Sequence, residues 1–313
     1  MGVRLTDKLF DYKAIKAETF SWSVARHELF AFCERACFYH YFGASGGFDG
    51  YSEPDAKKLY RLKKLIPGKL WLDNIFSQAL RETLTQSGRA KTPEEMTGEF
   101  SRRLIRAFHL GRRTVEAKEW QNDPGKLNLL ELYYHEVSVD KYFAALWTAL
   151  ESRFKKFSAS NLPAILHRVD NLDWKMIPLP AAFAIGKLQL WLAPDLIWRD
   201  GDCISILDLS GGGQSEEKRN IYAALNVIFA EEKFKISPEK VISLFFNDAS
   251  GQIELHGLEN LNISRVIEDI SASAAKMLEK ISPDGTVQGI NFAGSEQNCA
   301  RCRFREFCGS NSQ

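Results

Sequence analysis

The segment PDLIWRDGDCISILDLS, residues 194–210, contains two short apolar runs separated by the turn sequence RDGD. Runs of this kind predict the two strands of a β-hairpin. Asp195 stands at the start of the first run, and Asp208 stands near the end of the second. We therefore expect a hairpin that presents two carboxylates, which are ligands that Mg²⁺ and Mn²⁺ prefer.

The sequence around this hairpin predicts an α/β fold. Short apolar or alternating runs in AAFAIGKLQLWLAP and VISLFFND predict further strands of a central sheet. Helical periodicity is present at about residues 21–43, 55–87, 93–157, 215–234 and 262–281. The second of these helices should break at Pro67-Gly68, because proline interrupts a helix. After residue 162 the helical pattern changes to strands.

Length and composition favour a globular protein with a sizeable core, since the chain has 313 residues of which 45% are hydrophobic. The net charge of +1 does not indicate a nucleic-acid partner, so such a role would depend on local patches. The basic residues of two helical regions form either solvated faces or a phosphate-binding groove: Lys57, Lys58, Arg61, Lys63, Lys64, Arg102, Arg103, Arg106, Arg112 and Arg113. No apolar run approaches the ~20 residues of a membrane span, and the first residues lack a signal-peptide layout, so we expect a cytoplasmic protein without membrane contact.

The segment LSGGGQ, residues 209–214, resembles the signature of ABC-type ATPases with one extra glycine. That signature acts beside a phosphate-binding loop of the form Gly-x-x-x-x-Gly-Lys-Ser/Thr. The Gly-Lys pairs at 68–69 and 186–187 are each followed by leucine, which has no hydroxyl for Mg²⁺. The sequence therefore argues against an ATPase of this class.

The six cysteines are clustered: Cys33 and Cys37 lie near the start, Cys203 is alone, and Cys299, Cys302 and Cys308 lie near the end. In a cytosolic chain such clusters predict metal or cluster ligands rather than disulfides. The last three follow the spacing Cys-x2-Cys-x5-Cys, so one distant cysteine would complete four thiolates. We expect the aromatic run FYHYF, residues 38–42, to pack in this region rather than to stack on bases.

These features together resemble the PD-(D/E)XK nuclease superfamily, in particular its RecB-like branch with a C-terminal iron–sulfur motif, which is similar to CRISPR-associated RecB-like exonucleases. The hairpin resembles the family pattern Pro-Asp-Leu-Ile … Ile-Asp-Trp-Lys-Thr-Gly. The segment SWSVARHELFAFCERACFYHYFGASGG resembles its opening helix, and LYRLKKL with LWLDNIFSQALRETL resembles the helix that carries Gly-x-x-Val-His. NCARCRFREFC matches its closing cysteines.

The resemblance implies one domain over residues 1–313. Its restriction-endonuclease-like core would be a mixed central sheet flanked by helices, with a helical insertion and an iron–sulfur cluster that staples the chain ends together. The implied boundaries are a first cluster-ligand helix at 20–48, the insertion at 90–160, the sheet core at 162–250 and the cysteine-rich tail at 290–313.

The resemblance also implies that Cys33, Cys299, Cys302 and Cys308 hold a 4Fe-4S cluster. Thiolates suit such clusters, and closing so long a loop costs the unfolded chain on the order of 5 kcal/mol of entropy. Zinc on the same four thiolates is the alternative. Cys37 is a second candidate for the distant ligand, but Cys33 stands where the family motif has its cysteine. We expect Cys203 to be a buried thiol on a strand.

The departures from the family pattern lie at the catalytic positions. Ser210 stands where the catalytic lysine belongs, and Ser77 stands where the helical histidine belongs, with Asp73 in place of the glycine. Lys218 occupies the glutamine position of the Gln-x-x-x-Tyr helix, four residues before Tyr222. Loss of a positioned cation at the scissile phosphate lowers the rate roughly 10²- to 10³-fold, so we expect impaired catalysis.

The expected function is that of a pseudoenzyme, a nuclease-like DNA-binding protein in DNA processing, repair or defence. Asp195 and Asp208 are either residual Mg²⁺ or Mn²⁺ ligands or surface residues beside a turn. One alternative is an active Mg²⁺- or Mn²⁺-dependent DNA exonuclease in which Lys218, or Lys187 on the preceding strand, has replaced the missing lysine. Another is a noncatalytic scaffold subunit that binds protein partners in a larger complex.

Overall fold

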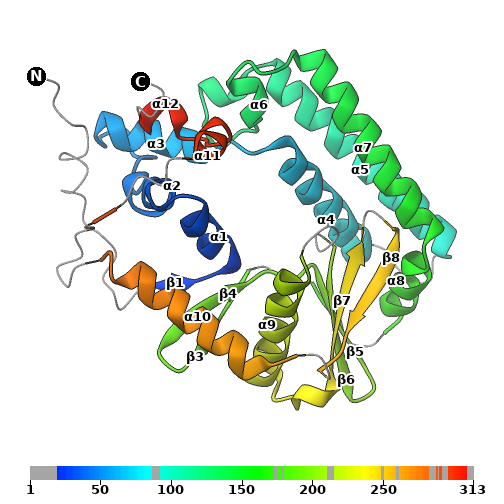
Figure 1. Cartoon of the computed structure of the whole chain (residues 1–313). Coiled ribbons are helices and arrows are strands. Elements are labelled where there is room, and N and C mark those ends of the chain that lie inside the picture. Colours follow the sequence, from blue (N-terminus) through cyan, green and yellow to red (C-terminus); the bar gives the residue numbers. More distant parts are fainter. Residues whose placement is uncertain are drawn as a thin grey trace, which may run out of the picture.

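The computed structural model describes residues 20–86, 92–172, 175–177, 180–209, 215–247, 250–258, 261–281, 287, 289–290 and 295–308. These residues form an α/β structure in which helices flank mixed sheets (Figure 1), so the predicted fold class is confirmed at this level. None of the helices in the described ranges combines the length and the apolar character that a membrane span requires.

The predicted hairpin forms the centre of a five-stranded sheet with the order β2-β5-β6-β7-β8. Its strands are β2 (Lys175–Met176), β5 (Leu196–Asp200), β6 (Cys203–Asp208), β7 (Val241–Asn247) and β8 (Gln252–His256). β5 and β6 pair antiparallel, whereas β6 and β7 pair parallel. Gly201 takes a φ of +60° in the hairpin turn, a conformation that glycine adopts without strain.

A second sheet has the order β1-β4-β3. It consists of β1 (Ser21–Trp22), β3 (Ala181–Ile185) and β4 (Leu188–Leu192). β3 and β4 form an antiparallel hairpin, and β1 adds to β4 in parallel. The N-terminal segment thereby joins strands that lie about 170 residues further along the chain.

The prediction of one continuous helix over residues 21–43 is wrong. The segment instead forms β1, α1 (Val24–Phe32), α2 (Glu34–Phe38) and the π-helical turn η3 (Tyr39–Gly43). Cys33 separates α1 from α2 because its backbone is extended, with φ −169° and ψ 117°. Its sulfur accepts the Ala36 N–H at 3.5 Å and so caps α2, which replaces the helical bond lost at the break.

Helices dominate the next part of the chain: α3 (Pro54–Lys63), α4 (Gly68–Gln86), α5 (Pro93–Glu116), η4 (Glu119–Gln121), α6 (Leu130–Tyr133), α7 (Val139–Ala159) and α8 (Leu162–Asp170). The predicted break at Pro67-Gly68 is confirmed. α5 begins with a capping box between Thr92 and Glu95. The predicted change to strands at residue 162 is wrong, because α8 occupies the segment that follows and buries Leu162, Leu166 and Val169.

The last helices are α9 (Glu216–Phe234), α10 (Ile263–Leu278), α11 (Glu296–Ala300) and α12 (Arg305–Cys308). The first two match the predictions for residues 215–234 and 262–281. α9 follows β6 and packs beside the sheet, which is the crossover that the parallel pairing of β6 and β7 requires.

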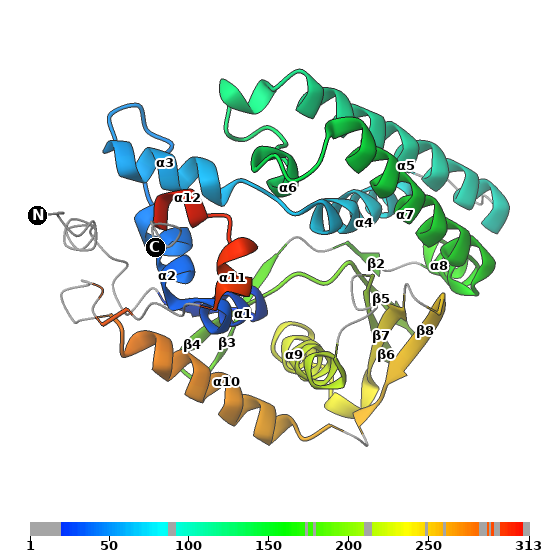
Figure 2. The same ribbon diagram turned by 45° about the horizontal axis from the view of Figure 1, so that its top comes forward.

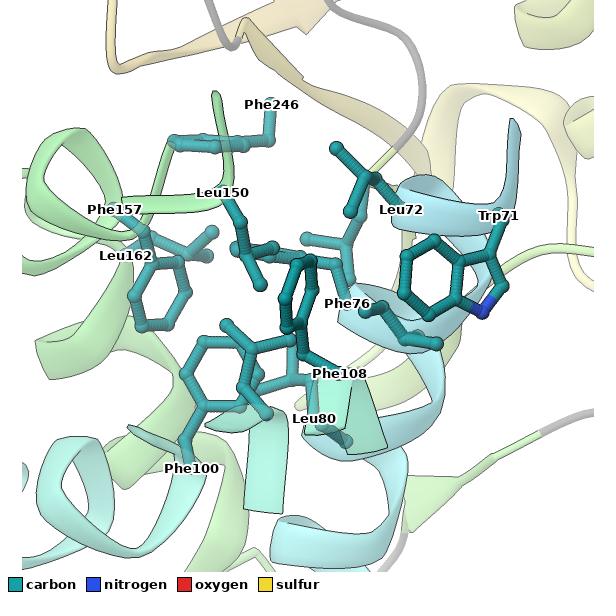
Figure 3. Close-up of a cluster of buried hydrophobic side chains, with 14 of the residues drawn as sticks. Trp71, Leu72, Phe76, Leu80, Phe100, Phe108, Leu150, Phe157, Leu162 and Phe246 are labelled. Atoms are coloured by element: carbon teal, nitrogen blue, oxygen red, sulfur yellow. The ribbon is translucent and has the colours of Figure 1, made fainter. Parts of the chain in front are cut away.

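The core in Figure 3 holds α4 against α5, α7, α8 and β7. Phe76 of α4 meets Phe100 of α5 edge to face, with ring centroids 5.0 Å apart. Phe157 of α7 meets Phe246 of β7 in the same way at 6.1 Å. Edge-to-face aromatic pairs add about 0.5–1.5 kcal/mol beyond the burial of their area. This packing fixes the rotation of α4 about its axis and therefore decides which of its polar side chains face the hairpin.

Candidate functional site

Asp195 and Asp208 lie at the same end of the β5–β6 pair, since Asp195 directly precedes β5 and Asp208 is the last residue of β6. Leu196 pairs with Leu207, and the Asp195 N–H also donates to the Leu207 carbonyl, at 3.1 Å. Two successive residues that face one residue of the neighbouring strand are the pattern of a β-bulge, which redirects a side chain at the end of a strand. Asp195 is 6% exposed and Asp208 is 8% exposed. The alternative that they are surface residues beside a turn is therefore wrong.

The carboxylate of Asp195 has two partners within the protein. Its Oδ1 accepts a hydrogen bond from Arg81 Nη2 at 2.8 Å, and its Oδ2 accepts the Leu209 N–H at 2.8 Å. Arg81 comes from α4 and lies 114 residues away in the sequence. A charge-assisted pair of this length neutralises a buried carboxylate. The guanidinium thus supplies the positive charge that a metal ion would otherwise supply to Asp195.

A second arginine reaches the same hairpin from α7. Arg153 Nη1 donates to Asp73 at 2.7 Å, and its Nη2 donates to the Leu209 carbonyl at 2.9 Å. Burial raises the pKa of Asp73, and the Arg153 guanidinium opposes that increase. Leu209 is therefore held at both backbone groups, by Asp195 and by Arg153, immediately before Ser210.

Ser77 lies on the same face of α4 as Asp73 and Arg81, the two α4 residues that form the ion pairs with Arg153 and Asp195. Asp73, Ser77 and Arg81 are spaced four residues apart, so they share one stripe of the helix. Ser77, which stands at the position where the resemblance implies a histidine, is 8% exposed and therefore buried. Ser210, the residue at the predicted lysine position, lies outside the described residues.

Tyr222 of α9 shares the electrostatic environment of the hairpin aspartates. Burial raises the pKa of its phenol, and the carboxylates of Asp208, Glu28 and Asp195 raise it further. Lys218, one turn earlier, forms an ion pair with Glu28 Oε1 of α1 at 2.5 Å, and its Nζ is 6.0 Å from the Tyr222 ring centroid. The side chain of Lys218 is thus directed toward α1.

Lys187 does not lie on a strand, contrary to expectation. It is exposed in the turn between β3 and β4, before the first residue of β4. Asp195 follows the other end of β4, and a strand of 5 residues spans ~17 Å. The length of β4 therefore separates Lys187 from Asp195, which argues against Lys187 as the replacement lysine.

Cys33, Cys299, Cys302 and Cys308 line one pocket, together with Phe32, Ala36, Tyr39, Asn298, Phe304 and Arg305. Cys33 comes from the break between α1 and α2, and the other three come from α11, α12 and the residues between them. The two ends of the described chain therefore meet at this pocket. All six cysteines are free thiols in the structure.

The surroundings of these four sulfurs suit thiolate ligands. The Phe304 N–H donates to Cys302 Sγ at 3.4 Å, and Arg35 Nη1 donates to Cys308 Sγ at 3.8 Å. Hydrogen bonds to sulfur and apolar walls are features of iron–sulfur sites. Burial raises the pKa of the Cys302 thiol to about 11, and the three neighbouring sulfurs add to the increase. A cationic cofactor is what would favour the ionised form of the Cys302 thiol in this pocket.

Cys37 and Cys203 lie away from this pocket. Cys37 lines a different one with Phe20, Arg26 and Phe38, and burial raises its pKa to about 12. It therefore does not compete with Cys33 for the same position. Cys203 begins β6, as predicted, but it is only half-buried.

His40 makes the cysteine region sensitive to acid. Burial lowers its pKa from 6.5 to about 3, and the charges of Arg303 and Lys63 add to the decrease. The folded protein binds a proton at His40 less readily than the unfolded chain does. The contribution of neutral His40 to the free energy of unfolding is therefore fully present above pH ~6.5 and is lost as the pH falls toward 3.

The free energy of unfolding should fall between pH 7.5 and pH 5, because the unfolded chain takes up a proton at His40 and the folded protein does not. We expect His40→Leu to reduce that fall by roughly 2 kcal/mol, since leucine binds no proton in either state. Urea unfolding at both pH values measures the effect. His109→Gln, on the exposed surface of α5, is the control and should leave the pH dependence unchanged. An identical pH dependence in His40→Leu would contradict the assignment.

Sequence reasoning did not identify Arg81 or Arg153. Arg81 had a local signal, because it follows Ser77 by one helical repeat on the same face. Arg153 had none, because its partner Asp73 lies 80 residues away. The part of the chain that the structure describes contains no group of three or more His, Cys, Asp or Glu side chains that could hold a metal ion. Metal binding by Asp195 and Asp208 stays a prediction.

Comparison with known proteins does not add to these observations. No model of a known protein family matches the chain, and no curated protein matches it. The function must therefore be inferred from the motifs and from the geometry of the two sites.

Proposed function

We propose that this chain is a PD-(D/E)XK nuclease-like DNA-binding protein, of the RecB-like type, that is impaired in catalysis. The observation that carries the proposal is the pairing of Asp195 with Arg81 at 2.8 Å and with the Leu209 N–H at 2.8 Å. Both carboxylate oxygens of Asp195 accept hydrogen bonds from the protein, and the Arg81 guanidinium supplies the positive charge beside them. A second carboxylate, Asp208, is then a weak metal site by itself.

The positions of the two lysines that could replace the missing catalytic lysine also support impaired catalysis. Lys218 is paired with Glu28 at 2.5 Å, and Lys187 lies at the far end of β4. A lysine that stabilises charge on a phosphate must be directed at that phosphate. The alternative of an active exonuclease with a migrated lysine therefore has no supporting contact among the described residues.

The DNA-binding half of the proposal concerns the basic residues of α5 and of α3. Arg102 and Arg103 of α5 pair with Glu99, and Arg112 pairs with Glu116 and Asp140, so much of the charge on α5 is balanced within the helix region. Arg106 and Arg113 are exposed on the same helix. Binding that weakens steeply with salt would support a nucleic-acid surface, whereas a scaffold for protein partners would show no such binding.

We also propose that Cys33, Cys299, Cys302 and Cys308 hold a 4Fe-4S cluster. The sulfurs share one pocket with apolar walls and N–H donors. Zinc on the same four thiolates is the alternative, and iron and zinc analysis of the purified protein separates the two. The cluster would serve as a structural link between the two ends of the chain.

The test of impaired catalysis is cleavage of end-labelled single- and double-stranded DNA with Mn²⁺. We expect no cleavage above background by the unmodified protein, because the cation at the scissile phosphate is missing. Activity in Ser210→Lys would show an intact fold in which that position had switched off the chemistry. Asp200→Ala, an exposed carboxylate at the other end of the hairpin, is the control for Asp208→Ala. Cleavage by the unmodified protein that disappears only in Asp208→Ala would contradict the proposal.

A further inference from the structure

Two aromatic side chains project into solvent from the loop that precedes α3. Phe48 is 76% exposed and Tyr51 is 99% exposed, and they stand three residues apart. Single exposed apolar residues are ordinary on protein surfaces, but two aromatic rings on one short loop form a patch that water solvates poorly. In Figure 2 this loop and α3 lie at the edge of the molecule, beside α12 and away from the sheets.

The loop holds these rings in place through its own hydrogen bonds. Asp49 Oδ1 accepts the Tyr51 N–H at 3.0 Å, and Ser52 Oγ donates to the Gly46 carbonyl at 2.5 Å. A Cβ at Gly47 would lie 2.2 Å from the Ala56 carbonyl oxygen, so only glycine allows the loop to pack this closely on α3. The aromatic rings therefore extend from a supported turn.

The outer face of α3 places positive charge beside the rings. Lys57, Tyr60 and Lys64 are spaced along one face of the helix. The Phe48 ring meets the Tyr60 ring edge to face at 6.1 Å, and Lys64 Nζ lies 5.2 Å from the Tyr60 centroid. Lys57 Nζ donates to the Gly50 carbonyl of the loop. The Phe48 and Tyr60 rings and the ammonium groups of Lys57 and Lys64 therefore lie around this loop and the adjoining face of α3.

The other basic residues of α3 are directed elsewhere. Lys58 pairs with Glu306, Arg61 contacts the Gln121 carbonyl and the Trp120 ring, and Lys63 donates to the His40 carbonyl. These contacts hold the helix in place. Lys57 and Lys64 are therefore the residues of α3 that belong to the aromatic surface.

We propose that Phe48, Tyr51, Tyr60, Lys57 and Lys64 form a binding surface for single-stranded DNA. Bases stack on the aromatic rings, and the two lysines contact the backbone phosphates. Unpaired bases are required, because the bases of a duplex already stack on one another. The inference rests on the proposed DNA-binding function and names where the strand binds.

The surface is attached directly to the cysteine pocket. Leu59 and Leu62, on the inner face of α3, pack in one core with Phe304 and Phe307. Arg303 Nη1 also donates to the Lys63 carbonyl at 3.0 Å. The four-cysteine region therefore positions α3, so loss of the proposed cluster should also weaken binding to the single strand.

The test is fluorescence anisotropy of labelled oligo(dT) and of an abasic oligomer of equal length, with the full chain. Stacking on each aromatic ring contributes roughly tenfold to affinity, so Phe48→Ser/Tyr51→Ser should weaken binding of oligo(dT) about 100-fold. Binding of the abasic oligomer should change little. Leu110→Ser on α5, which is 61% exposed, is the matched control and should bind both oligomers as the unmodified protein does.

Lys57→Gln/Lys64→Gln should weaken binding of both oligomers and reduce the salt slope by about 1.4, since two phosphate contacts are lost. Unchanged oligo(dT) binding by Phe48→Ser/Tyr51→Ser would overturn this surface while leaving the DNA-binding proposal intact. Absence of binding to any DNA by the unmodified protein would overturn both. If the unmodified protein binds anionic vesicles, and Phe48→Ser/Tyr51→Ser loses vesicle binding but still binds DNA, the surface belongs to a membrane contact instead.

Discussion

Replacing Arg153 with methionine is expected to lower the free energy of unfolding by about 3–5 kcal/mol. Arg153 is 7% exposed, and its guanidinium links Asp73 of α4 to the Leu209 carbonyl after β6. The substitution leaves a carboxylate and a carbonyl without this partner in a region from which water is largely excluded. Removing one member of a buried pair is far more costly than replacing both members. Urea unfolding followed by tryptophan fluorescence measures the loss.

Arg168→Met is the control for this prediction. Arg168 pairs with Asp200 at 2.6 Å, but the two side chains are 68% and 49% exposed, so the variant should lose less than about 1 kcal/mol. The double variant Asp73→Leu/Arg153→Met should be more stable than Arg153→Met alone, because no unpaired charge remains. Equal losses in Arg153→Met and Arg168→Met would show that the arginine does not hold the hairpin to α4.

Replacing Cys302 with alanine is expected to remove the proposed cluster. Protein purified without oxygen should be brown with about four iron atoms per chain, and Cys302→Ala should be pale with little iron. Cys302 is one of four sulfurs that join the two ends of the described chain. Because closing that loop costs the unfolded chain on the order of 5 kcal/mol, the variant should also melt at a markedly lower temperature.

Cys203→Ala is the matched control for the cluster. Cys203 is half-buried on β6 and does not line the four-cysteine pocket, so this variant should keep its iron and its colour. Absorption spectra, iron analysis and thermal melting of the three proteins complete the test. A colourless unmodified protein with stoichiometric zinc would reject the cluster, and loss of iron in Cys203→Ala would reject this set of ligands.

The elements that were predicted well are those whose signal is local. The hairpin at residues 194–210 follows from apolar runs and a turn, and both are properties of adjacent residues. α9 and α10 follow from the periodicity of their own apolar residues. The extended backbone at Cys33 was missed, because the periodicity of the flanking residues continues across it while tertiary contacts determine the break.

The charges around the hairpin were predicted less well. Arg81 reaches Asp195 over 114 residues of sequence, and Arg153 reaches Asp73 over 80 residues. Lys218 was one of two candidates for the missing lysine, and its pairing with Glu28 depends on where α1 packs against α9. Neither periodicity nor composition contains information about such partners.

The amino-acid sequence by itself determined the α/β class, the hairpin with its two aspartates and the spacing of the closing cysteines, because these depend on neighbouring residues. The tertiary structure alone decided that Asp195 faces a guanidinium, that Cys37 lines a different pocket from the other clustered cysteines, and that Phe48 and Tyr51 stay in solvent. Each of these depends on the packing of segments far apart in the chain, and a buried charge or thiol acquires its chemistry from whichever group that packing places beside it.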